Sequence, residues 1–430
     1  MKPTQRRVVI TGLGLMTPCG EGWQPFWQAA LNAKSSIRSI TQMSLNGFPS
    51  KFAGEIVDID LSRLIKNRKS LKVMSKTIKL AVAASYFALE DAGLRLEEVN
   101  ATRFGVSMGT GIINNDLDEI GTGIRQAVGS SGKFEMQKFG QEGIRALFPL
   151  WFLKYLPNMP ACHISITHGL KGPSNTITTS SAAGAQAIGE AYHVIQRGDA
   201  DLILAGSADS KLNAMGISRF HLLGLLSQEN HSPEHAYRPF DERHSGIVLG
   251  EGAGLVLLEE ATHAEKRGAH IYGEIAGYGS SSDYNYDPRR SEDFTGKSRA
   301  MHRALQHASI HPEEIDAVLA NGSGIPQEDI QEVKAVQDVF GKSAERLKVT
   351  AVKPITGHLI YGSGGVEFAA AILAIKENQI PPLAHFKKAA EKCMLPFVEK
   401  EPASVRVRSL LFNSFGFGGQ NASLVVKQYE

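Results

Sequence analysis

The sequence is poor in cysteine and has no long apolar runs. Its 430 residues include three cysteines, Cys19, Cys162 and Cys393, which lie far apart and form no Cys-x-x-Cys pair. A disulfide framework and a cysteine metal site are therefore excluded, and a reducing, cytoplasmic compartment is expected. Because no apolar stretch of about 18 residues occurs, we predict no membrane span. The first apolar run is also too short for a signal peptide.

The chain also lacks an excess of charge of either sign. Lys and Arg total 46, Asp and Glu total 44, and the formal net charge is +2. This balance argues against a general nucleic-acid binder. The sequence has no P-loop, no HExxH motif and no paired Cys and His at metal spacing, so we predict no metal and no cofactor. His163 and His168 are interpreted as core or loop residues rather than as metal ligands.

Short β-branched strands alternate with helices along the chain, which predicts a layered α/β fold. The predicted strands cover residues 7–12, 104–108, 200–206, 254–258, 272–279 and 316–320, and the predicted helices cover 75–92, 180–197 and 364–377. Similar strand, glycine turn and small-residue helix patterns occur twice. We interpret them as two duplicated halves, residues 1–260 and 261–430, although two unrelated α/β units would give a similar pattern.

A turn between a predicted strand and the first small-residue helix carries Ser181, in the segment TTSSAAG. A polar residue between a strand and a helix is the layout of a nucleophile elbow. The helix N-terminus would favour an anion there. Serine is also a preferred helix N-cap, so a purely structural role is the alternative.

Two later motifs carry further candidate residues. Lys353, His358 and Glu367 surround one turn, where they can handle protons or bind an oxyanion, or can form an ordinary surface salt bridge. Phe415 and Phe417 alternate with glycines in SFGFGG. That segment is either a mobile hinge with aromatic plugs or a tight turn with two core aromatics.

Taken together, the motifs resemble the elongating β-ketoacyl-ACP synthases of the thiolase superfamily. The strongest matches are GPSNTITTSSAAG, GDADLILAGSAD, RPFDERHSGIVLGEGAGLVLLE, VKPITGHLIYGSGGVE and NSFGFGGQN, and similarity covers nearly the whole chain. The resemblance implies a thiolase-like five-layer αβαβα fold built from two duplicated halves. It also implies an obligate dimer and an active site made of one Cys, two His and a Lys.

The chain departs from that family at two catalytic positions. The family's nucleophilic Cys falls at Ser181 and its first His falls at Asn321. The second His, the Lys, its Glu partner and the gating phenylalanines are retained as His358, Lys353, Glu367, Phe415 and Phe417. A serine alcohol is a weak nucleophile without a general base, whereas a Cys at a helix N-terminus has an appreciable thiolate fraction.

The resemblance is therefore greatest to the chain-length factor, the ketosynthase beta subunit of type II polyketide synthases. It predicts a non-catalytic subunit that forms a heterodimer with an active ketosynthase and meets an acyl carrier protein. One alternative is an active enzyme that uses Ser181 and His358 as a synthase, acyltransferase or decarboxylase. The other is a pure binding protein for the carrier or for acyl chains.

Two further segments belong to this prediction. In the family, the position after Gly-Thr-Gly lines the acyl pocket at the dimer interface, which implies an acyl tunnel at Ile112, Ile113, Asp116 and Ile120. If this segment is helical, residues 112, 116 and 120 share one face. The aromatic segment 129–157 is expected to be buried, in a pocket or at an oligomer interface.

Residues 66–79, KNRKSLKVMSKTIK, form a basic run. It is either a solvated helical face or a docking surface for an acidic partner. Under the second interpretation the docking residues are Lys66, Arg68, Lys69 and Lys72.

Overall fold

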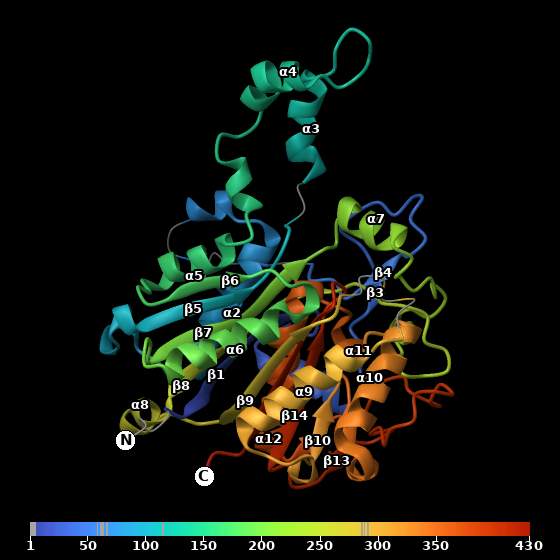
Figure 1. Ribbon diagram of the computed structural model, residues 1–430. Coiled ribbons are helices and arrows are strands. Elements are labelled where there is room, and N and C mark those ends of the chain that lie inside the picture. The colour runs from blue at the N-terminus through green and yellow to red at the C-terminus, as the bar shows by residue number, and fades with distance from the viewer. Residues whose placement is uncertain are drawn as a thin grey trace.

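The computed structural model describes residues 6–57, 59–60, 64–65, 68–113, 116–284, 287, 289 and 292–430, and one mixed sheet runs through it (Figure 1). Across the sheet the strands are β11 (Lys348–Thr350), β10 (Ala317–Leu319), β14 (Ser409–Phe415), β15 (Gln420–Lys427), β9 (Gly273–Ser282), β1 (Val8–Thr17), β8 (Glu251–Glu260), β7 (Leu202–Ser210), β5 (Phe104–Gly109) and β6 (Ser174–Ile177), with β2 (Gly20–Glu21) beside β1. Two small hairpin-like pairs are β3 (Arg38–Ser39) with β4 (Phe52–Ala53) and β12 (Gln379–Ile380) with β13 (Ala403–Ser404). Every strand predicted from the sequence occurs.

The two halves of the sheet repeat one topology. In the first half β6, β5 and β7 are parallel neighbours, and β8 and β1 follow antiparallel. In the second half β11, β10 and β14 are parallel neighbours, and β15 and β9 follow antiparallel. The halves meet where β1 pairs with β9. This repetition confirms the thiolase-like fold of two duplicated halves; the division at residue 260 stays a prediction.

Helices form three layers around the two half-sheets. The middle layer contains α6 (Ala183–Gln196) and α12 (Ser363–Glu377), which are buried along almost their whole length. These two helices can approach closely because both begin with small residues. A Cβ atom on Gly184 would lie only 2.9 Å from the Cα atom of Gly364. The sequence pattern of small residues therefore reflects helix-to-helix contact at the centre of the molecule.

The outer layers cover the remaining sheet faces. On one side α2 (Lys76–Asp91) packs on β1, β7 and β8 beside α5 (Met159–His168), and on the other α9 (Thr295–Ala308) packs on β9 and β15 beside α10 (Pro326–Phe340). The other helices are α1 (Trp23–Leu31), α3 (Leu117–Gln126), α4 (Met136–Lys138), α7 (Ala214–Leu222), α8 (Ala261–Lys266) and α11 (Lys353–Thr356). Within the described part of the chain, none of the helices is long and apolar enough to cross a bilayer.

An arm containing α3 and α4 extends away from the body of the molecule (Figure 1). Its aromatic side chains are exposed in the single chain: Phe134 by 46%, Phe148 by 50% and Phe152 by 47%. Within the single chain these side chains are not buried, and their burial at an oligomer interface stays a prediction. Exposed apolar surface of this kind is typical of a site that contacts another molecule.

Candidate active site

Ser181 lies where β6 leads into α6, in the short 3-10 turn η7 (Ser180–Ala182). Ser180 has a φ of +54°, in the left-handed region that non-glycine residues adopt rarely and mostly at functional turns. Ser181 is only 1% exposed, and its hydroxyl has no hydrogen-bond partner among the described residues. The N-cap of α6 is Ala182, so the capping role considered for Ser181 is wrong. The layout is that of a nucleophile elbow with a buried, unpartnered hydroxyl.

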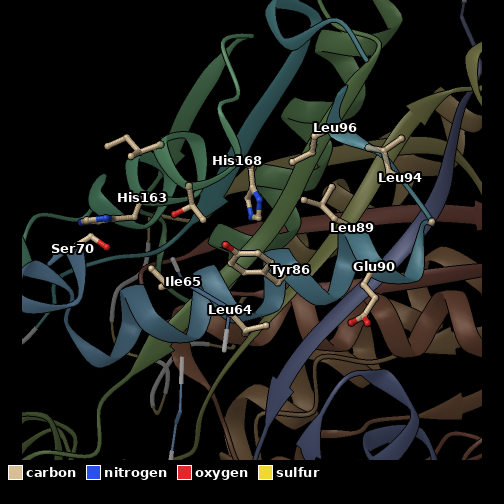
Figure 2. Close-up of a pocket in the computed structure, with 13 residues that line it drawn as sticks. Leu64, Ile65, Ser70, Tyr86, Leu89, Glu90, Leu94, Leu96, His163 and His168 are labelled. Carbon is tan, nitrogen blue, oxygen red and sulfur yellow. The ribbon is translucent and has the colours of Figure 1, made fainter. Parts of the chain in front are cut away.

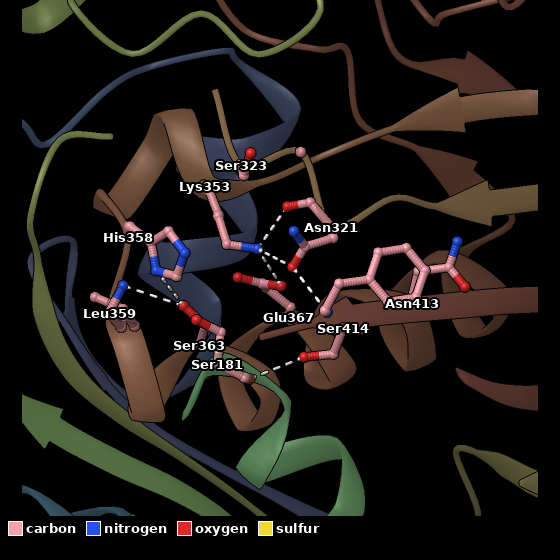
Figure 3. A network of polar contacts seen from close by, with 12 residues as sticks. Ser181, Asn321, Ser323, Lys353, His358, Leu359, Ser363, Glu367, Asn413 and Ser414 are labelled. Carbon is pink, nitrogen blue, oxygen red and sulfur yellow. Dashed lines mark hydrogen bonds and ion pairs between the residues drawn. The ribbon is translucent and has the colours of Figure 1, made fainter. Parts of the chain in front are cut away.

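His358 faces the same region from the second half of the chain (Figure 3). The backbone N–H of Ile360 donates to its Nδ1 atom at 3.1 Å, so in the neutral ring the proton is on Nε2. Burial, with a further contribution from the nearby Lys353 cation, holds the pKa of His358 well below its usual value. The side chain is thus a neutral imidazole that presents an N–H donor.

This protonation state decides what His358 can do to Ser181. Neither the Ser181 hydroxyl nor the His358 Nε2 atom has a hydrogen-bond partner in the described part of the chain, so the two do not bond to each other. A general base must accept the nucleophile's proton, and Nε2 already carries one. The geometry therefore supplies a donor for a carbonyl oxygen or oxyanion and supplies no base for Ser181.

Lys353 connects the remaining candidate residues. Its Nζ atom donates to the Oε2 atom of Glu367 at 2.9 Å, to the Oδ1 atom of Asn321 at 3.1 Å and to the Asn321 carbonyl (Figure 3). The Phe415 N–H also donates to the Asn321 Oδ1 atom, at 3.2 Å. Because this oxygen accepts two hydrogen bonds, the amide NH2 is the group that Asn321 can offer to a ligand. Asn321, Lys353, His358 and Glu367 are all nearly or fully buried.

Glu332 on α10 also shapes the site, and the sequence analysis missed it. Its carboxylate accepts the backbone N–H groups of Asn321 at 2.7 Å and Gly322 at 2.9 Å. Burial raises the pKa of Glu332 to about 7, although these two donors oppose the shift. The available signal was the position of Glu332 on α10, next to Val333 and one turn before Val336, on the face of the helix that is buried.

The two gating phenylalanines take different positions. Phe415 is a core residue, 2% exposed, and the Lys297 Nζ atom lies 5.5 Å from its ring centroid. The half-buried Phe417 covers His358, with ring centroids 5.3 Å apart. The segment thus combines the two structural alternatives: one aromatic belongs to the core and the other lies over the site.

The predicted tunnel and docking residues lie outside this cluster. The helix α3 begins at Leu117 with Asp116 as its N-cap, so the helical condition for a face shared by residues 112, 116 and 120 is not met. Ile112 is 59% exposed and Ile113 is 6% exposed, whereas Ile120 is half-buried on α3. Arg68, Lys69 and Lys72 are exposed, and Lys66 lies outside the described residues.

A separate cavity of about 790 Å³ lies between α2 and α5 (Figure 2). Two histidines line it, His163 and His168. The Nε2 atom of His168 is 2.8 Å from the Ser85 hydroxyl, and its ring packs edge-on against Tyr86. Burial lowers the pKa of His168 to about 4. In this structure His168 is a packed, neutral side chain.

The neutral state of His168 predicts a pH dependence of stability. A histidine in the unfolded chain has a pKa near 6.5, so its folded pKa is depressed. The stabilisation of the fold by neutral His168 is fully present at pH values above the pKa of the unfolded chain. It is lost as the pH falls from about 6.5 toward 4, because the histidine of the unfolded chain binds the proton more tightly. We expect His168 to account for a loss of about 2 kcal/mol over that window. Urea unfolding at several pH values checks this, with His168→Gln as the matched variant. An equally steep profile in His168→Gln would contradict it.

Comparison with known protein families agrees with this geometry. The model of the beta-ketoacyl synthase N-terminal domain matches residues 5–264, and that of the beta-ketoacyl synthase C-terminal domain matches residues 272–387. The chain is 35% identical over 429 residues to 3-oxoacyl-[acyl-carrier-protein] synthase 2 of Coxiella burnetii, covering 99% of each chain. It is also 35% identical over 425 residues to the protein of the same name from Staphylococcus aureus strain COL, again covering 99% of each.

Solved structures with the same fold include a ketosynthase/chain length factor and a ketosynthase in complex with an acyl-carrier protein. A chain of the ishigamide ketosynthase/chain length factor superposes with a TM-score of 0.87 at 28% identity, covering 99% of this chain and 100% of the other. A chain of AntDE:AntF, a type II polyketide synthase acyl-carrier protein in complex with its ketosynthase bound to the hexaketide, superposes with a TM-score of 0.85 at 28% identity and the same coverage.

Proposed function

The chain belongs to the beta-ketoacyl synthase family, and we propose that it is a non-catalytic, chain-length-factor subunit of that family. It would pair with an active β-ketoacyl-ACP synthase in type II polyketide or fatty-acid-like chain elongation. The observation that carries the proposal is the state of Ser181: the residue at the nucleophile position is a buried alcohol whose hydroxyl has no hydrogen-bond partner among the described residues.

The chemistry of condensation explains why this observation matters. The growing chain must first be bound to the enzyme through an activated nucleophile. Among the residues that the structure describes, no group accepts the Ser181 proton, since the Nε2 atom of His358 is itself a donor. The site retains donors that can hold a carbonyl oxygen, from His358 and Asn321. It can therefore bind an acyl-type oxygen without forming a covalent intermediate.

The surface of the first half supports a partner subunit. The strand β6 ends the sheet and, within the described residues, pairs only with β5, which leaves its other edge open. An open strand edge is a ready template for a strand of another chain. The arm that carries α3 and α4 adds exposed apolar side chains, among them Phe148 and Ile144. An edge and an apolar arm on the same half suit a second ketosynthase-like chain.

The exposed Ile112 fits a tunnel shared with that partner. Its side chain points away from its own core, while Ile113 beside it is buried. A partner that covers the arm would enclose Ile112 at the interface. The proposed tunnel then includes Ile112, Ile113, Asp116 and Ile120. For the acyl carrier protein we propose docking at the exposed Arg68, Lys69 and Lys72, because a carrier rich in acidic groups would be attracted to clustered cations.

One rival function has its own support. The relatives at 35% identity are named as synthases, and His358, Lys353 and Glu367 keep the family's residue types. An active enzyme would use Ser181 as its nucleophile. The orphaned Ser181 hydroxyl argues against this function, and the experiment below separates the two.

The test uses the full chain alone and with an intact ketosynthase of the same system. Incubated alone with acyl- or malonyl-carrier protein, the chain is expected to keep its unmodified intact mass. Together with the active subunit it should form a heterodimer whose product lengthens with Ile112→Ala and shortens with Ile112→Phe, because an overfilled tunnel end costs about 1–3 kcal/mol. Stable acylation that disappears in Ser181→Ala would establish the active enzyme instead. Unchanged products from intact Ile112 heterodimers would contradict the tunnel.

A further inference from the structure

Tyr361 lies three residues after His358, in the 3-10 turn η11 (Ile360–Gly362). Its ring packs directly on the backbone of Gly111, in the segment that follows β5. A Cβ atom on Gly111 would lie 2.0 Å from the Tyr361 Cζ atom and 2.2 Å from its Cε1 atom. Only glycine leaves room for the ring in this position, so the two residues form one closed contact.

A buried ion pair holds this ring in place. The Lys211 Nζ atom lies 2.8 Å from the Asp209 Oδ1 atom, and the two side chains are 3% and 1% exposed. The same Nζ atom donates to the Ile112 carbonyl and lies 5.1 Å from the Tyr361 ring centroid. The Tyr361 N–H donates to the second Asp209 oxygen at 3.3 Å. Lys211 and Asp209 thus tie Tyr361 to the segment after β5.

The cluster occupies the place where a ligand would be expected. Gly111 follows β5 and Lys211 follows β7, and these two strands are parallel neighbours. Ligands of such sheets bind beyond the carboxyl ends of the strands. The end of β5 also touches the start of α6, since a Cβ atom on Gly109 would lie 2.4 Å from the backbone of Ala183. The turn η11 packs against η7, which carries Ser181.

We propose that Tyr361, clamped by Lys211 and Asp209, plugs the space beside Ser181 and closes this subunit's own site to acyl groups longer than a few carbons. The plug is part of the packed structure rather than a moving gate. Withdrawing the ring would remove its cation–π contact with Lys211 and its packing on Gly111. The inference rests on the proposed function in one respect: the growing acyl chain belongs to the partner's site.

The test places a reactive thiol at the bottom of the plugged space. Ser181→Cys is treated with methyl and n-decyl methanethiosulfonate, and the adduct at position 181 is measured by peptide mass spectrometry. The thiolate attacks the sulfenyl sulfur, a disulfide forms, methanesulfinate leaves, and the thiol proton goes to solvent. Ser181→Cys should react with the methyl reagent far better than with the decyl reagent. Tyr361→Ala in the same background should raise the decyl-to-methyl ratio at least about tenfold.

The controls separate the ring from other effects. Tyr361→Phe retains the ring and should leave the ratio low, and the unsubstituted chain should show adducts only at its natural cysteines. An unchanged ratio in Tyr361→Ala, or no methyl labelling in that variant, would overturn the plug. Acylation of the unsubstituted Ser181 would overturn the proposed function and leave the labelling ratio unaffected, so the two failures are distinguishable.

A stability measurement tests the ring contact without labelling. Gly111→Ala should lower the melting temperature by several degrees while Tyr361 is present, because the new methyl group would collide with the ring. In the Tyr361→Ala background the same change should have less than half that effect. Additive shifts would show that the ring does not lie over Gly111 and would overturn the proposal.

Discussion

Ser181→Cys alone is expected to restore little condensation activity, and Ser181→Cys with Asn321→His is expected to be roughly 100-fold or more faster. The thiol supplies the missing nucleophile, but the oxyanion donor at position 321 is still an amide bound through its oxygen to Lys353 and to the Phe415 N–H. An imidazole there would have its Nδ1 atom facing the same two donors. Its proton would then be on Nε2, as in His358.

The measurement is the rate of condensation of an acetyl primer with malonyl-carrier protein. A two-carbon primer is chosen because the Tyr361 contact restricts longer chains in this subunit. Asn321→His alone, which has no thiol, is the matched control and should stay at background. Residues that act as a unit are non-additive, so the double variant should exceed the product of the single effects. Full activity from Ser181→Cys alone would show that Asn321 already serves as an adequate donor.

Lys353→Met is expected to lower the free energy of unfolding by about 3–5 kcal/mol. Lys353 and Glu367 are 1% and 5% exposed in their side chains and bond at 2.9 Å. Removing the cation would leave the Glu367 carboxylate buried without its partner. The penalty of an unpaired buried charge exceeds the net value of the intact pair, because both groups have already lost their hydration.

Urea denaturation of Lys353→Met, Glu367→Leu and the variant that carries both changes measures this effect. Lys353→Met with Glu367→Leu should lose less than Lys353→Met alone, because no uncompensated charge remains. The exposed pair of Lys388 and Glu242 supplies the control, since its side chains are 73% and 45% exposed. Lys388→Met should change stability by less than about 1 kcal/mol. Equal losses for Lys353→Met and Lys388→Met would contradict the assignment of a buried, desolvated pair.

Local sequence patterns predicted a layered α/β fold, and the family resemblance of the motifs implied its thiolase-like form. Strand and helix positions follow from periodicity and from glycine at turns, so the segments around 104–108 and 364–377 occur close to their predicted bounds. The motifs also singled out Ser181, Lys353, His358 and Glu367, and the family resemblance predicted that they lie together. Such patterns are local, because each lies in one continuous stretch of the chain.

Tertiary structure alone decided the chemistry of those residues. The tautomer of His358 depends on the backbone N–H of Ile360. The orientation of the Asn321 amide depends on Lys353 and Phe415. Neither appears in a residue pattern, since hydrogen-bond geometry is set by where elements dock. The exposure of the arm in a single chain also follows from tertiary structure, because its aromatic side chains lie away from the core of their own chain.

The contact between Tyr361 and Gly111 joins residues that are 250 positions apart in the numbering of the sequence. It is decided by how η11 lies against the end of β5, and Lys211 and Asp209 reach it from β7. Identity and spacing along the chain determined what kind of fold forms and which side chains are candidates for the site. Packing between distant segments decided the protonation and the exposure of these side chains. Both properties arise only when the segments meet.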